Sequence, residues 1–275
     1  MRYILISFFF SSYLLALIVE PIHTRISAIN LEDKILEAEA IKGAQVGMYG
    51  VIVKHFNDKH ATALSWVEVT GIKEGKIHAK MIPIYALEQS ALPAGTWVSD
   101  VGDELVLGYN YHRALLIAPN PSVYKKVTQY HKEKKWVHPD IFAAVLSTNG
   151  HPTPLIEDFS NMCRVNNIGV ISFVIDSSIL TLDCHSFKIL SNKKTLQQNN
   201  EVQLPFYTRV TNIESNWFGK GNEELNEYGF YYINLIADNN PDNEWIQNYQ
   251  KTHYKKNILG QWIQNTESNL TQKTQ

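Results

Sequence analysis

One stretch of the chain decides the fold, because in it short apolar runs alternate with proline-marked helix starts. Its segments are ALLIAPN (114–120), WVHPDIFAA (136–144), HPTPLIEDF (151–159), IGVISFVID (168–176) and DCHSFKIL (183–190). Asn120-Pro121 predicts a helix start, since Asn accepts hydrogen bonds from free N–H groups and Pro has no N–H to satisfy. His138-Pro139 and Thr153-Pro154 predict two more. Residues 112–191 are therefore predicted to form an α/β region that ends in a pair of strands.

Upstream, residues 29–111 have the pattern of a β-rich region. Short alternating runs at 46–56, 61–70 and 77–84 are separated by turn signals. Several short strands with tight turns predict a small β-barrel or sandwich. The glycines around the first run fit bends in a curled strand, because no Gly-Lys-Ser/Thr phosphate loop follows them.

Downstream, residues 192–263 predict a C-terminal helical region. Asn222 with two following glutamates marks one helix start, and Pro241-Asp242 marks another. Residues 264–275 are polar and predict a flexible tail. The expected fold class is thus mixed α+β, with a small β-barrel or sandwich, an α/β region and C-terminal helices in that order.

Residues 1–28 have the character of a targeting segment. Arg2 precedes an uncharged run over residues 4–19, which ends at Glu20-Pro21. The run is about four residues short of the ~20 needed to span a bilayer, which favours a cleaved signal peptide, with Ser27-Ala28 at the junction. An uncleaved N-terminal anchor is the alternative, and it would be the only membrane contact. Either predicts an exported protein in the periplasm, outer membrane or cell surface.

Export places the two cysteines, Cys163 and Cys184, in an oxidising compartment where a disulfide can form. Cys163 also continues a helical apolar stripe with Phe159 and Met162, which favours a free cysteine that packs in the core as a small hydrophobe. The spacing leaves both alternatives open.

Composition and motifs argue against several classes of function. A net charge of −2, with 44% apolar and 19% charged residues, gives no basic field for nucleic acid. No metal-binding HExxH or CxxC spacing occurs among the ten histidines and two cysteines, and no Gly-x-Ser-x-Gly nucleophile motif is present. We therefore expect no catalytic residues, no metal and no cofactor.

The quoted segments, together with VGMYGVIVKHF (46–56) and GDELVLGYNYHRALLIAPN (102–120), resemble the N-terminal domain of the plasminogen-binding protein family, the PgbA type of epsilon-proteobacteria. The resemblance covers roughly residues 46–190. It implies a non-catalytic, exported envelope or surface protein that binds host plasminogen through lysines that engage its kringle domains.

Two groups of lysines are candidates for that role. Lys132-Glu133-Lys134-Lys135 places cations beside an anion near a predicted helix end, although lysines there also suit a solvated helix C-terminus. Lys273 would suit a kringle if it ended the chain, but it is followed by Thr274 and Gln275. This departure keeps a second interpretation open, a periplasmic structural or assembly component that holds other envelope proteins together and does not bind plasminogen.

The tail carries one modification motif. Asn269-Leu270-Thr271 is an Asn-x-Thr acceptor, and Glu267 lies at the acidic position that epsilon-proteobacterial glycosylation prefers. Asn269 is therefore a candidate glycosylation site.

Overall fold

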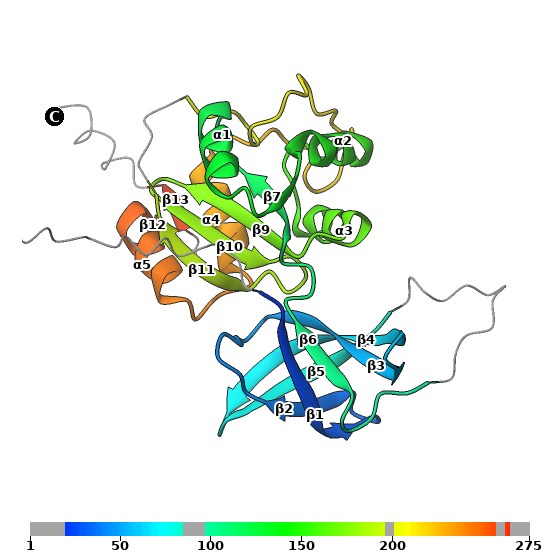
Figure 1. Ribbon diagram of the computed structural model, residues 1–275. Helices are drawn as coiled ribbons and strands as arrows, with labels where there is room; N and C mark the ends of the chain where they lie inside the picture. Colours follow the sequence, from blue (N-terminus) through cyan, green and yellow to red (C-terminus); the bar gives the residue numbers. More distant parts are fainter. Residues whose placement is uncertain (1–19, 85–96, 196–200, 257–261, 265–275) are drawn as a thin grey trace, which may run out of the picture.

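Six antiparallel strands close into a barrel near the N-terminus (Figure 1, blue to green). The computed structural model describes residues 20–84, 97–195, 201–256 and 262–264. The barrel strands are β1 (Ile22–Asn30), β2 (Ile35–Glu39), β3 (Tyr49–Asn57), β4 (His60–Lys73), β5 (Lys76–Pro83) and β6 (Glu104–Leu107). Their order is β1-β2-β5-β4-β3-β6, and β6 pairs back onto β1. Of the two predicted alternatives, barrel and sandwich, the structure has the barrel.

The barrel begins before residue 29. In β1, Ile22, Thr24 and Ile26 face inward while the residues between them are exposed, and the strand pairs with neighbours on both sides. The boundary between residues 28 and 29 thus falls inside β1, and cleavage there would remove most of this strand. His23 and Arg25 lie on the outer face and alternate with the inward residues, which is the pattern of a strand. The sequence analysis did not reveal this strand, because the segment directly follows the apolar run. That run, residues 4–19, lies outside the described residues.

A five-stranded sheet forms the centre of the second unit. It contains β7 (Arg113–Ile117), β8 (Lys135–Val137), β9 (Val170–Ile175), β10 (Ser178–Asp183) and β11 (Ile189–Lys194) in the order β11-β10-β9-β7-β8. β7 runs parallel to β8 and β9, whereas β10 is antiparallel to both of its neighbours. The predicted α/β region and its final pair of strands are thus present, together with the added edge strands β8 and β11.

Three helices connect the parallel strands: α1 (Pro121–Tyr130), α2 (Pro139–Asn149) and α3 (Ile156–Asn166). Asn120 caps α1 by accepting a 2.9 Å hydrogen bond from the Val123 N–H, and His138 caps α2 from the N–H of Asp140. α3 begins later than Pro154 suggests, because the buried Asp158 carboxylate accepts from the Leu155 N–H and fixes the first turn there. Local capping chemistry therefore set two of the three helix starts.

The C-terminal part contains α4 (Tyr228–Ala237), α5 (Glu244–His253) and the short pair β12 (Tyr254–Lys256) and β13 (Trp262–Gln264). α4 begins six residues after Asn222. The preceding segment is held instead against the turn between α2 and α3, where Thr153 N–H donates to Gly221 and Asn216 N–H donates to Gly150. Tertiary hydrogen bonds thus replaced the predicted helical turn.

Within the described residues, none of the helices combines the length and apolar character needed to cross a membrane.

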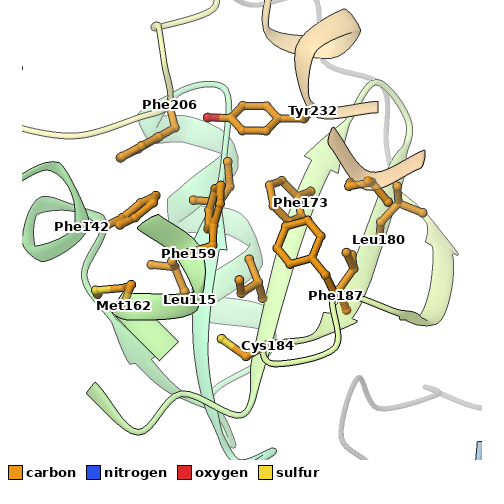
Figure 2. Close-up of a cluster of buried hydrophobic side chains, with 14 of the residues drawn as sticks. Leu115, Phe142, Phe159, Met162, Phe173, Leu180, Cys184, Phe187, Phe206 and Tyr232 are labelled. Atoms are coloured by element: carbon orange, nitrogen blue, oxygen red, sulfur yellow. The ribbon is translucent and has the colours of Figure 1, made fainter. Parts of the chain in front are cut away.

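The largest core lies between the sheet and helices α2 to α5, and Figure 2 shows its aromatic centre. The rings of Phe142 and Phe159 lie 4.6 Å apart, and Phe173 contacts Phe159 at 5.5 Å and Tyr232 at 5.2 Å. Alternate residues of β9 serve different cores, because Phe173 faces this cluster, Val174 faces α1 and Val170 enters the barrel core. The central strands are consequently buried on both faces, which explains their nearly continuous apolar sequence.

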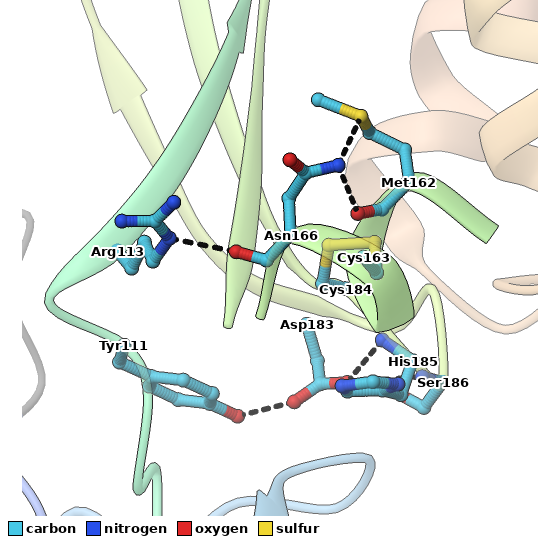
Figure 3. The surroundings of a disulfide bond; sticks show 9 residues. All are labelled: Tyr111, Arg113, Met162, Cys163, Asn166, Asp183, Cys184, His185 and Ser186. Carbon is cyan, nitrogen blue, oxygen red and sulfur yellow. Dashed lines mark hydrogen bonds between the residues drawn. A yellow bond between two sulfur atoms is a disulfide. The ribbon is translucent and has the colours of Figure 1, made fainter. Parts of the chain in front are cut away.

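Cys163 on α3 and Cys184, directly after β10, form a disulfide whose Cα atoms are 5.8 Å apart (Figure 3). Both residues are fully buried in the large core. Cys163 faces the core, as the apolar stripe predicts. The preferred interpretation, a free cysteine, is wrong, and the alternative disulfide is present. Spacing along the chain could not reveal the bridge, because the packing of α3 over β10 brings the two positions together.

The barrel and the sheet meet at the fully buried Asp183 (Figure 3). Its Oδ2 accepts a 2.6 Å hydrogen bond from the Tyr111 hydroxyl and a 3.0 Å bond from the Tyr49 N–H of β3. Its Oδ1 accepts from the backbone N–H groups of His185 and Ser186. Burial raises the pKa of Asp183, and these hydrogen bonds oppose that rise. The carboxylate thereby ties the barrel to the end of β10.

Two further contacts complete this junction. The Ser186 hydroxyl donates to the Gly47 carbonyl at 2.6 Å, and Gly47 has a φ of +86°. A Cβ at Gly47 would lie 2.3 Å from Cβ of Lys188, so glycine allows the two units to approach. From the other side, the buried Lys134 ammonium donates to the Tyr111 carbonyl at 2.8 Å, and the side chain is only 4% exposed. Burial lowers the pKa of Lys134 to about 8.

Removal of the disulfide should destabilise the protein. The bridge joins residues 21 positions apart, and closing a loop of this size lowers the entropy of the unfolded chain by the equivalent of about 3 kcal/mol. We expect Cys163→Ala/Cys184→Ala to lose about this free energy of unfolding, measured by urea denaturation without reductant. Reductant should destabilise the wild type and leave the variant unchanged. An unfolding midpoint equal to that of the oxidised wild type would contradict this prediction.

Lys134 should make stability depend on pH in the alkaline range. Its pKa falls from 10.5 in the unfolded chain to about 8 in the folded protein, so the unfolded state binds more protons between these values and stability rises with pH there. Relative to Lys134→Met, the wild type should gain about 2 kcal/mol in free energy of unfolding between about pH 7.5 and 9.5. Urea denaturation of both proteins at each pH measures this gain. A difference that stays constant with pH would show that Lys134 is not the titrating group.

Candidate functional site

Residues 131–135, called the 131–135 loop below, link α1 to β8 and include the first residue of β8. They contain the cations that the sequence singles out. The His131 N–H donates to Val127 at the end of α1, and the His131 carbonyl accepts from the indole Nε1 of Trp136 at 3.0 Å. The Lys134 N–H donates to the same carbonyl at 3.2 Å. These bonds hold the backbone of the loop in place.

The four candidate side chains of this loop divide into two groups. Lys134 turns inward to Tyr111 and belongs to the junction, which differs from the expectation that it contacts a partner. Lys132, Glu133 and Lys135 are exposed. The sequence could not reveal this division, because the carbonyl that accepts from Lys134 is supplied 23 residues earlier in the chain.

The exposed part of the loop combines two cations with one oriented anion. Glu133 Oε1 lies 3.0 Å from Nδ1 of the buried His131. Burial raises the pKa of Glu133, but hydrogen bonds from its own N–H and from His131 outweigh this and hold the pKa below its ordinary value. Glu133 is therefore ionised at neutral pH, with Lys132 beside it in sequence. A cation and an anion presented together is the arrangement that a lysine-binding site recognises.

Positive charge continues from this loop onto the sheet edge. Lys135 lies in the edge strand β8, where its register partner is Arg113 of β7. Burial and then the charges of Lys135, Arg113 and Lys134 lower the pKa of His112. The edge of the sheet thus has a local positive potential although the chain as a whole is slightly acidic.

Lys273 and Asn269 lie outside the described residues, as does the N-terminal run. Among the residues that the structure does describe, no three His, Cys, Asp or Glu side chains come together in a way that could hold a metal.

Sequence reasoning missed one polar cluster on the barrel. Glu104 of β6 accepts from His23 of β1 at 2.8 Å and from His55 of β3 at 2.6 Å. The hydrogen bonds from His55 and His23 lower the pKa of Glu104. The three residues lie on neighbouring strands that are far apart in sequence, so only the strand order could have brought them together.

Comparisons with known proteins place the chain in a family. Its sequence matches the family model described as plasminogen-binding protein pgbA N-terminal over residues 21–236, from just before β1 to the last turn of α4. Two curated proteins of Helicobacter pylori, from strains J99 / ATCC 700824 and ATCC 700392 / 26695, are each named plasminogen-binding protein PgbA and are 28% identical over 217 residues. The alignments cover 77% of this chain and 47% of each relative, so the chain spans about half the length of the curated relatives it matches. The chain belongs to the family defined by the N-terminal region of the plasminogen-binding protein pgbA.

Proposed function

We propose that this protein is an exported, non-catalytic protein of the cell envelope or surface that binds plasminogen. The observation that carries the proposal is the family match over residues 21–236. The name of the two H. pylori relatives supports the same partner. The apolar run that precedes the barrel supports export, because its length and flanking Arg2 are typical of a targeting segment.

The exposed cations of the 131–135 loop are the proposed contact with a plasminogen kringle. Lys132 and Lys135 extend into solvent, and Glu133 between them supplies the anion that accompanies lysine in ligands of this kind. The loop is also fixed in place by the bonds to the His131 carbonyl and by Lys134. A fixed loop loses less conformational entropy on binding than a free one.

Binding of the full chain to immobilised plasminogen, with and without a lysine analogue as competitor, tests this function. We expect binding that the analogue abolishes, and a loss of about tenfold in affinity for Lys132→Ala/Lys135→Ala. The matched control is Lys125→Ala/Lys126→Ala, which removes the same charge from exposed positions on α1.

The two variants separate specific recognition from general attraction. Equal losses in both would contradict a role for the 131–135 loop, while absence of binding by the wild type would contradict the proposed function itself. Protease accessibility on intact cells tests the location, because a protein confined to the periplasm is protected and cannot meet a host zymogen.

A further inference from the structure

A row of aromatic rings lies on the outside of the barrel where it meets the sheet unit. Tyr49 of β3 stacks on His185 with ring centroids 4.8 Å apart, and His185 lies 6.3 Å from Trp66 of β4. The Trp66 ring is 6.4 Å from that of Tyr109, and the two planes are inclined by 58°. Trp66 and Tyr109 therefore form two walls of a wedge, with His185 as a third ring.

The strand register places a carboxylate beside these rings. Tyr49 pairs with Glu68 and Val51 pairs with Trp66, so all four side chains project from the same face of the β3-β4 pair. That face is the outer one, because the adjacent residues Ile52 and Val67 project to the opposite face and belong to the barrel core. Val51 is buried although it lies on the outer face.

The Glu68 carboxylate is half-buried, and its register partner across the sheet is Lys80 of β5. No hydrogen bond or ion pair joins Glu68 to Lys80 or to another residue in the described part of the chain. Burial, followed by the nearby Asp183 charge, raises the pKa of Glu68, whereas the charges of Lys188 and Lys80 act in the opposite direction. Lys188 is already engaged, since its Nζ donates to the Asn239 carbonyl at 2.5 Å. A half-buried carboxylate without a direct partner gains free energy when a ligand supplies a cation.

Of the two carboxylates at this place, Glu68 is the one that keeps open acceptor positions, although the cations of Lys80 and Lys188 lie near it. Asp183 and Glu68 give the junction two carboxylates, and four donors already fill the hydrogen-bonding positions of Asp183. Burial lowers the pKa of His185, which keeps its ring neutral at neutral pH although part of the residue is exposed. Tyr109 remains 48% exposed, so the outer wall of the wedge is open to a ligand.

We propose that Trp66, Tyr109 and Glu68 form a binding site for an organic cation of the alkylammonium class. The ammonium group lies against the faces of the two rings and forms an ion pair with Glu68, while the alkyl chain covers the apolar ring surface. Cation–π contacts and a single charge-assisted bond together correspond to a dissociation constant of about 1 mM for a small ligand. The cation comes either from a lysine side chain of a protein or from a free polyamine.

Titration of the full chain, followed by NMR through the indole N–H signal of Trp66, tests the proposal. That signal is assigned with Trp66→Phe. The probes are Nα-acetyl-lysine amide, spermidine and the uncharged Nα-acetyl-norleucine amide. We expect the two cations to shift the signal with saturation and the uncharged probe to leave it unchanged. Tighter binding of spermidine identifies the free amine as the source, and tighter binding of the lysine derivative identifies a protein side chain.

Two variants and a control complete the experiment. Glu68→Gln and Tyr109→Leu should each weaken cation binding by about tenfold. Glu39→Gln removes the same charge from an exposed position on β2 and should leave binding unchanged. Equal affinity in Glu68→Gln and wild type, or equal shifts with the uncharged probe, would overturn the proposal. Glu68→Gln should still bind plasminogen, so this result is independent of the function proposed above.

Discussion

The buried Asp183 carboxylate is the interaction on which the arrangement of the two units depends. It accepts four hydrogen bonds, one from β3, one from Tyr111 after the barrel and two from the turn after β10. A buried carboxylate is costly unless each oxygen is satisfied, and here the donors come from both units. The bond network therefore forms only when the barrel and the sheet are in their native relative positions. Gly47 permits the same close approach, because a side chain there would collide with Lys188.

The surfaces of functional interest are consequences of this junction. Lys134 reaches the carbonyl of Tyr111, whose hydroxyl binds Asp183, so the 131–135 loop is anchored to the same network. On the barrel side, the turn after β10 places His185 against Tyr49 and next to Trp66. The proposed plasminogen contact and the proposed cation site thus share one support but present different chemistry. The first offers exposed cations, and the second offers rings and a carboxylate.

Features governed by local chemistry could be predicted from the sequence. The helix starts at Asn120 and His138 follow from side chains that cap their own helix, and the α+β order follows from hydrophobic periodicity. Features that depend on distant partners could not. The inward turn of Lys134, the Cys163–Cys184 bridge and the cluster around Glu104 each require residues 21 to 81 positions apart to meet. The displaced start of α4 has the same cause, since hydrogen bonds to residues 150–153 hold the segment before it.

Hydrogen exchange of the wild type and Asp183→Asn tests the central claim that this carboxylate unites the barrel and the sheet. Asn keeps the shape of Asp but has one acceptor oxygen in place of two, so at least one junction donor loses its partner. The account predicts that amides of β3 and β9 open with similar free energies in the wild type. In the variant, the amides of β3 should exchange faster than those of β9, because the barrel opens on its own. Unequal opening in the wild type, or identical exchange in both proteins, would contradict the account.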